Sequence, residues 1–304
     1  MKLLICSDGS EAAARAVRLG AAVAEACRAE VTLLAITEMS AEVEQIGEML
    51  QGTQRLFAER KIPARLITRD GDPIHEIIQE SESGTFDLVV VGAAEKGSRG
   101  RFWRSSKTYK IIKSIRPPVL AVMGELTTIK QILLCTGGKK YIDNAVALTG
   151  CIAHGMGARV TLFHVLAAPP AIYQRLYEQE VDVEAVLNSR SELGRNLREQ
   201  KATLEGLGVR VEVKLRKGLV LDEIFREINA GNYDLLVSGS SLSRGRLQTY
   251  VLGEVTREIV NRARCAVLVA RAAGKSETVT ASLRAWLDRV TRRGVRGEKV
   301  VREE

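Results

Sequence analysis

The chain of 304 residues contains the same strand-like segments twice, in the same order. The matching pairs are 2–6 with 131–135, 31–34 with 160–163, 86–90 with 233–237, and 116–120 with 264–268. The offset between partners is 129 residues for the first two pairs, 147 for the third and 148 for the fourth. Such a repeat predicts two copies of one domain. The rise from 129 to 147 predicts an insertion of 18 residues in the second copy, at about residues 167–187.

Each copy alternates apolar, strand-like runs with helical stretches. We expect strands at residues 3–7, 31–37, 64–69, 87–91 and 118–123, and again near 130–135, 159–166, 209–215, 234–238 and 266–271. In the first copy we expect helices at residues 11–28, 40–61, 73–80 and 105–115, and in the second one long helical stretch ending near Leu207. This alternation predicts an α/β fold, with two tandem doubly wound domains that each have a parallel sheet covered by helices on both faces. Ligands of such sheets bind at the carboxyl ends of the strands, where the strand order reverses.

The composition sets further bounds. Hydrophobic residues make up 45% and charged residues 27% of the chain, as in soluble globular proteins. No run approaches the ~18 apolar residues of a membrane span, and the chain enters its first strand directly, so we expect a cytoplasmic protein. The five cysteines lie in mostly apolar surroundings and the three histidines lack zinc-site spacing, which predicts reduced thiols and no metal beyond a nucleotide-associated Mg²⁺.

Charge is concentrated in one segment of the first copy. Residues 96–116 carry eight basic residues and no acidic one. Two interpretations stay open: an anion-binding loop, or a solvated loop and helix face on which Lys107, Lys110 and Lys113 recur at helical spacing. Nucleic-acid binding is not expected, because aromatic residues are only 4% of the chain and no group of aromatic residues on which bases could stack can be identified.

Polar and small residues follow two strands of the first copy. Cys6-Ser7-Asp8-Gly9-Ser10 ends the first strand, and Gly92 ends the fourth, before a loop that leads to Ser105-Ser106 at an expected helix start. Glycines allow a backbone to approach phosphate oxygens, and amides at a helix N-terminus donate hydrogen bonds to them. An aspartate beside them can accept hydrogen bonds from a ribose or an adenine amino group. Alternatively, Asp8 only caps the helix that follows, for which Ser10 is the expected N-cap.

These motifs resemble those of the universal stress protein family, over about residues 1–272. The resemblance rests on the strand order, the Asp8-Gly9-Ser10 turn, Gly92 and Gly239 after the fourth strands, and the fifth strands. It implies five-stranded sheets of order 3-2-1-4-5, paired through their fifth strands into an internal pseudo-dimer. It also implies ATP binding or a stress and signalling role, and leaves a homodimer of the chain open.

The resemblance places a nucleotide site in the first copy. The residues expected there are Ser7, Asp8, Gly9, Ile36, Gly92, Ala93, Ser105, Ser106 and Lys107. Two positions depart from the family pattern. Glu95 occupies the place of the second glycine, where a carboxylate repels a phosphate, and Ser105-Ser106 replace Gly-Ser.

A weaker site is expected in the second copy. Its residues are Gly137, Gly138, Val165, Gly239, Ser240 and Gly253. Thr136-Gly137-Gly138 stands where the aspartate turn belongs, so the acidic group is absent. Glu254 replaces the serine or threonine that ends the family motif.

The sequence therefore predicts universal-stress-protein-like domains at residues 1–125 and 126–272, followed by a basic tail at 273–304. The expected function is that of a cytoplasmic stress-response regulator that binds ATP or another anion, and the alternative is a ligand-free interaction module with degenerate sites. No pair of a nucleophile and an activating base can be identified in the sequence, so we expect no catalytic residue, although weak ATPase activity is left open. In the tail, Leu283, Trp286, Leu287 and Val290 form one apolar helical stripe. We expect it to dock on the protein itself or on a partner, either another protein or an acidic membrane surface.

Overall fold

A computed structural model describes residues 1–37, 43–93, 103–137, 143–167, 181–240, 254–271 and 283–290. The first copy consists of β1 (Lys2–Ser7), α1 (Glu11–Cys27), β2 (Glu30–Thr37), α2 (Val43–Glu59), β3 (Ala64–Asp70), α3 (Pro73–Ser83), β4 (Leu88–Gly92), α4 (Trp103–Ser114) and β5 (Val119–Val122). The second consists of β6 (Gln131–Cys135), α5 (Asp143–Met156), β7 (Arg159–Ala167), α6 (Val183–Asn188), α7 (Glu192–Glu205), β8 (Arg210–Gly218), α8 (Val220–Ala230), β9 (Leu235–Ser240), α9 (Glu254–Arg262) and β10 (Ala266–Arg271). A further helix covers residues 283–290.

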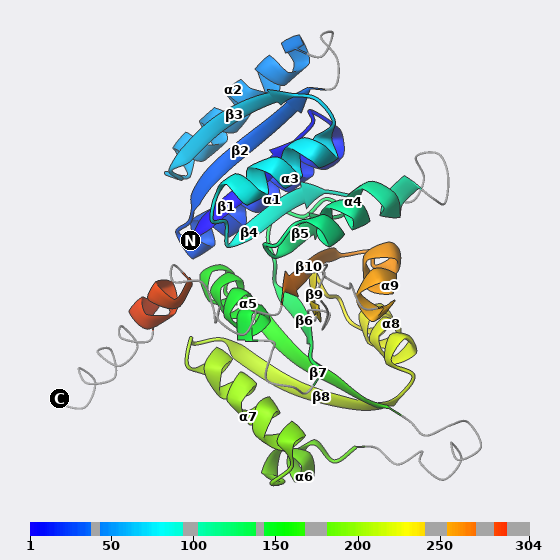
Figure 1. The fold of residues 1–304 in the computed structure, drawn as a ribbon. Coiled ribbons are helices and arrows are strands. Elements are labelled where there is room, and N and C mark those ends of the chain that lie inside the picture. Colours follow the sequence, from blue (N-terminus) through cyan, green and yellow to red (C-terminus); the bar gives the residue numbers. More distant parts are fainter. Residues whose placement is uncertain are drawn as a thin grey trace, which may run out of the picture.

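The strands form one continuous sheet that runs through both copies (Figure 1). Its order is β3-β2-β1-β4-β5-β10-β9-β6-β7-β8, so each copy has the predicted order 3-2-1-4-5 with parallel neighbours. The copies join through their fifth strands, which pair antiparallel with Leu120 opposite Leu268. The α/β class and the fifth-strand pairing are confirmed. The two expected sheets are a single ten-stranded one, because pairing satisfies the backbone groups along both fifth-strand edges.

Helices cover both faces of this sheet. Side chains of β1 alternate, so that Leu3 and Ile5 join one apolar cluster and Leu4 and Cys6 join the other. The first cluster includes residues of α1, α2, α5 and α7, and the second includes residues of α3, α4, α8 and α9. None of the described helices is long and apolar enough to cross a membrane.

The copies also meet through α1 and α5. A Cβ atom at Gly155, near the end of α5, would lie 2.3 Å from the carbonyl oxygen of Ala26 in α1. Only glycine permits such a close approach of two backbones. The helix pair therefore supports the strand pairing on one face of the sheet.

Two expectations about helices were wrong. The helical stretch expected to end near Leu207 is divided into α6 and α7, because Ser191 accepts a hydrogen bond from the Gly194 amide at 3.0 Å and starts a new helix. Helix α4 begins at Trp103, so Ser105 and Ser106 lie inside its first turn instead of capping it. Residues 168–180 of the expected insertion lie outside the described residues.

The tail helix docks on the protein's own core. Leu283 is 1% exposed and Trp286 is 4% exposed, while Leu287 and Val290 pack against the same cluster. The apolar stripe of the tail thus covers the protein itself, which was one of the two alternatives. The rest of the expected basic tail lies outside the described residues.

Candidate functional site

The carboxyl ends of β1 and β4 border a small cavity in the first copy. Its volume is about 90 Å³. The residues that line it are Cys6, Ser7, Asp8, Ser10, Ala13, Ile36, Pro73, Ile74, Ile77, Val91, Gly92, Thr108 and Ile111. Four of the expected site residues are among them, namely Ser7, Asp8, Ile36 and Gly92. The structure therefore brings the strand-end residues together with α4, at the place where the strand order reverses.

Asp8 holds the turn that follows β1. One of its carboxylate oxygens, Oδ1, accepts hydrogen bonds from the Ser10 amide at 3.1 Å and the Ser10 hydroxyl at 2.5 Å. Ser10 is the N-cap of α1, as expected, and accepts a hydrogen bond from the Ala13 amide at 3.2 Å. Gly9, between them, has a φ of 75°, which favours glycine. Asp8 therefore orients Ser10, which is itself the N-cap. The other carboxylate oxygen of Asp8, Oδ2, has no hydrogen-bond partner among the described residues.

Gly92 is required by packing. A Cβ atom there would lie 2.4 Å from the carbonyl oxygen of Ala12 and 2.8 Å from the amide nitrogen of Ala13. The end of β4 therefore touches the first turn of α1 backbone to backbone. This contact explains the glycine without a ligand, although the same contact shapes the wall of the cavity.

The amide of Ala93 is already occupied. It donates a hydrogen bond to the carbonyl oxygen of Val122 at 2.9 Å, and the side chain is buried. Ala93 consequently has no free amide to offer to a phosphate. Ser105 and Ser106 belong to the first turn of α4 and Lys107 follows directly after it, and the side chains of all three lie outside the described ones.

The floor of the cavity is apolar. Cys6, Ile36 and Ile77 are each less than 5% exposed and line it together. Burial, with a smaller contribution from the charge of Glu80, raises the pKa of the Cys6 thiol far above its usual value. Cys6 is thus a neutral, apolar side chain here and is not poised as a nucleophile.

Sequence reasoning missed several lining residues, above all Thr108 of α4. Thr108 is 6% exposed and faces the cavity beside Gly92. A signal for it exists in the sequence, because Thr256 repeats it at the offset of 148 that also relates the fifth strands. Residues of α3 such as Ile77 are reached only through the fold and have no motif.

At the corresponding place in the second copy, two buried hydroxyl groups are hydrogen-bonded within the protein. Ser238 and Thr256 hydrogen-bond each other at 3.1 Å, and the Thr256 hydroxyl donates to the carbonyl oxygen of Gly239 at 3.3 Å. Both side chains are at least 96% buried. Val165 is also buried, and Ser240 ends β9.

The second copy also lacks the acidic group at this place. Gly137 stands at the position of Asp8, and a Cβ atom there would meet no atom of the described residues within 4 Å. The neighbouring Thr136 carbonyl oxygen is engaged by His164 Nδ1 at 2.7 Å. Gly138 and Gly253 lie outside the described residues. Within the described part of the chain, no group of His, Cys, Asp and Glu side chains is arranged to hold a metal ion.

Comparisons with known proteins agree with this architecture. The model of the universal stress protein family matches residues 1–123 and again residues 128–271. The universal stress protein YxiE of Bacillus subtilis is 25% identical over 144 residues, which are 40% of this chain and 97% of that protein.

Among solved structures, a universal stress protein from Archaeoglobus fulgidus superposes with a TM-score of 0.63 at 17% identity, over 90% of this chain and 98% of that one. Another universal stress protein was solved in complex with cAMP and matches 48% of this chain and 99% of its own, with a TM-score of 0.34 at 20% identity. The similarity to the Archaeoglobus structure concerns the fold. The cAMP complex is a finding about the other protein. Two matches of the family model, which together span most of the sequence, show that this chain belongs to the universal stress protein family.

Proposed function

We propose that the first copy binds an adenine nucleotide, or another anion of similar shape, at the crevice between β1 and β4, and that the protein serves stress regulation without being an enzyme. The observation that carries the proposal is the convergence of Asp8, Gly92 and Thr108 on one cavity at the carboxyl ends of the strands. The second copy has no carboxylate at the matching position, so the proposal is for one nucleotide per chain.

The chemistry of the cavity supports this assignment. Asp8 is exposed and offers Oδ2 to a ribose hydroxyl or an adenine amino group, while Oδ1 keeps the turn in place. The apolar floor formed by Ile36 and Ile77 suits the face of a base. The phosphates would extend toward the start of α4, where Ser105 and Ser106 lie in the first turn and Lys107 follows them.

A second candidate function, a ligand-free interaction module, is favoured by other observations. The cavity of about 90 Å³ is far smaller than the roughly 300–1,000 Å³ of a typical ligand site. Gly92 is explained by its contact with Ala12, and the amide of Ala93 is used within the sheet. In this case both copies would be scaffolds whose strand ends are simply well packed.

Calorimetric titration with Mg·ATP separates the two candidates. We expect wild-type protein to bind one ATP per chain, and Asp8→Ala to weaken it by about 1–3 kcal/mol, or roughly 5- to 150-fold. Asp8→Asn keeps an acceptor for Ser10 but loses the charge, so it distinguishes a role in the turn from a role toward the ligand. Asp182→Ala is the matched control, because Asp182 also accepts a backbone hydrogen bond at a helix start but lies in the other copy.

Each outcome is decisive. Saturable binding that Asp8→Ala weakens and Asp182→Ala leaves unchanged would support the nucleotide site. If Asp8→Ala binds ATP with the same affinity as wild type, the role of Asp8 is in the turn alone. A wild-type protein without saturable binding would favour the ligand-free module.

We propose domain boundaries at residues 125/126 and 272/273, assembly of the chain as a homodimer, and action in the cytoplasm. The five cysteines, all free thiols, support a reducing compartment. Sedimentation and fractionation test the last two points.

A further inference from the structure

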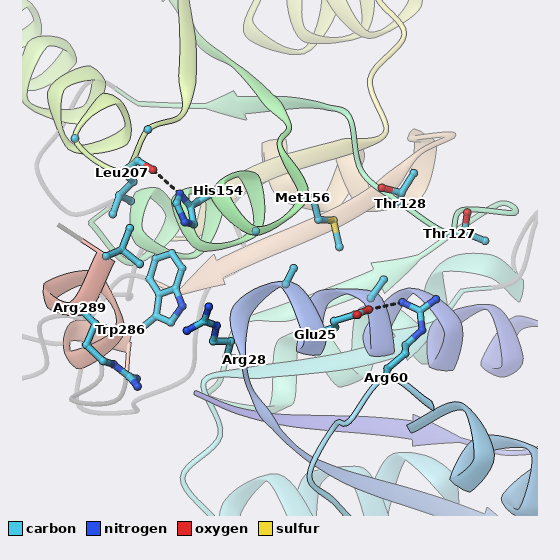
Figure 2. Close-up of a pocket in the computed structure, with 16 residues that line it drawn as sticks. Glu25, Arg28, Arg60, Thr127, Thr128, His154, Met156, Leu207, Trp286 and Arg289 are labelled. Carbon is cyan, nitrogen blue, oxygen red and sulfur yellow. Dashed lines mark hydrogen bonds and ion pairs between the residues drawn. The ribbon is translucent and has the colours of Figure 1, made fainter. Parts of the chain in front are cut away.

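A groove lies where the two copies meet the tail helix (Figure 2). Its volume is about 880 Å³. The ends of α1 and α5, the turn after α7 and the helix at residues 283–290 form its walls. It is separate from the crevice of the first copy, because α1 places Ala13 at the crevice and Ala22, Glu25 and Ala26 at the groove. Ala13 and Ala22, the nearest of these residues, are about 14 Å apart along the helix axis at 1.5 Å per residue.

The charged side chains of this groove are mainly positive. Three arginines line it, namely Arg28, Arg60 and Arg289, and Glu25 is the one acidic residue among the lining residues. Glu25 is neutralised by Arg60, whose guanidinium lies 2.8 Å from its carboxylate. Two positive charges therefore remain unbalanced within the groove.

Those two charges belong to Arg28 and Arg289. Both side chains are exposed, and neither has an acidic partner among the described residues. Arg289 donates its Nε hydrogen to the Ala285 carbonyl oxygen at 3.1 Å, which leaves the other N–H groups of its guanidinium available. Figure 2 shows Arg28 extending from the end of α1 toward Trp286.

Helix ends also face the groove, and their carbonyl groups would oppose an anion. Several of these carbonyl groups already accept hydrogen bonds within the protein. The Arg28 amide donates to the carbonyl oxygens of Ala24 and Glu25, and His154 Nδ1 donates to that of Leu207 at 2.6 Å. A helix end carries about half an elementary charge at most, whereas each guanidinium carries a whole one. The net preference of the groove is thus for an anion.

The side of the groove next to the tail helix is apolar and aromatic, while Thr127 and Thr128 line another part of the groove. Trp286 is 4% exposed and its ring meets that of His154 edge to face, with centroids 5.8 Å apart and planes at 77°. Met156, Leu207 and Val290 complete this side. The hydrogen bond to Leu207 fixes the His154 ring against the indole, so this wall is preformed.

We propose that this groove binds a small organic acid with an apolar body, a carboxylate or sulfonate carried on a flat ring system. Arg28 and Arg289 hold the acidic group, and the wall of Trp286, His154 and Met156 takes the body. The volume matches the roughly 300–1,000 Å³ of ligand sites, and sites between domains are common places for ligands. This site includes both copies and the tail helix, so it exists only in the tandem chain.

The test uses a pair of probes that differ by one charge. 8-Anilinonaphthalene-1-sulfonate has the sulfonate, and N-phenyl-1-naphthylamine has the same ring system without it. Binding is followed by energy transfer from Trp286 in a Trp103→Phe protein, in which Trp286 is the remaining tryptophan. We expect saturable binding of the sulfonate at one site per chain, and about tenfold or greater weakening in Arg28→Gln and in Arg289→Gln.

Two controls make the outcome decisive. Arg210→Gln removes an exposed arginine that does not line the groove and should change affinity by less than about twofold. The uncharged probe should bind wild type and Arg28→Gln alike. Sulfonate binding that survives both groove substitutions, or that is lost in Asp8→Ala, would overturn the proposal, the latter by placing the probe in the crevice. Equal melting temperatures of all variants ensure that folded proteins are compared.

Discussion

Replacing Gly92 by alanine tests whether this glycine serves packing or a ligand. The added methyl group would lie 2.4 Å from the Ala12 carbonyl oxygen, 2.5 Å from the Ala12 carbonyl carbon and 2.8 Å from the Ala13 nitrogen. Ordinary contacts of a Cβ atom begin near 3.4 Å, so the two backbones would have to separate by about 1 Å. All three atoms are backbone atoms, and no side-chain rotation can relieve the clash.

The expected loss of stability follows from the part of the structure that the added methyl group would displace. The first turn of α1 would shift away from β4, although Ala13, Ala16 and Val17 of that helix are buried against the sheet. Overpacking of a well-packed interior costs about 1–3 kcal/mol, and a backbone clash belongs at the upper end. We therefore expect Gly92→Ala to reduce the free energy of unfolding by about 3 kcal/mol. For a protein of this size the melting temperature should fall by roughly 5–10 °C.

Thermal unfolding followed by circular dichroism measures this change. Gly52→Ala is the matched control, because Gly52 lies inside α2, is exposed, and would place its Cβ atom in open space. There the same substitution should stabilise the protein by about 0.5–1 kcal/mol, since alanine favours helix more than glycine does.

One result would refute the packing argument for Gly92. If Gly92→Ala melts within about 1 °C of wild type, the two backbones are not held together as described. If Gly92→Ala keeps the melting temperature of wild type but no longer binds ATP, Gly92 is needed for the ligand, as the family motif implies.

Two further predictions concern the second copy. Glu227 is 4% exposed; burial alone would raise the pKa of its carboxyl, but hydrogen bonds from Tyr233 at 2.7 Å and Lys214 at 3.0 Å outweigh burial and lower it. The stabilisation by the ionised Glu227 carboxylate is therefore present at neutral pH and is lost as the pH falls through that lowered pKa. Glu227→Gln should reduce the free energy of unfolding by about 1–3 kcal/mol at pH 7, and by progressively less below about pH 4. Urea unfolding at a series of pH values measures this difference. Leu219 is 64% exposed at the start of α8 and provides no side-chain cap, whereas Asp72, 147 residues earlier, caps α3 by accepting from the His75 amide at 2.9 Å. Leu219→Asp should therefore stabilise the protein by about 0.5–2 kcal/mol, and an unchanged urea midpoint would mean that the new carboxylate does not reach the helix amides.

The order of the strands could be predicted because the repeat makes each copy a template for the other. The apolar runs at residues 3–7 and 131–135 mark central strands whichever helices surround them. Helix boundaries were less predictable where polar residues have two roles. Ser191 reads as one more residue of a helical stretch, yet α6 has already ended at Asn188 and the Ser191 hydroxyl caps the start of α7.

The candidate site was predictable only at its strand ends. Asp8 and Gly92 stand beside apolar runs and are therefore visible in the sequence. The contact that makes Gly92 necessary joins residues 80 positions apart, and no local pattern reports such a distance between two backbones. The groove was invisible for the same reason. Arg28 and Arg289 are ordinary surface arginines until the fold places both beside Trp286.

The antiparallel contact between β5 and β10 has a consequence for how the two halves can vary. Two separate subunits depend on concentration to meet, whereas halves joined in one chain face each other at a fixed, millimolar-range effective concentration. Dilution should therefore leave the joint intact. A substitution in a symmetric pair of identical subunits also alters both partners at once, but here it alters one side only. Aspartate at position 8 and glycine at position 137 can thus coexist in every molecule, so that the chain behaves as an obligate heterodimer whose partners never exchange.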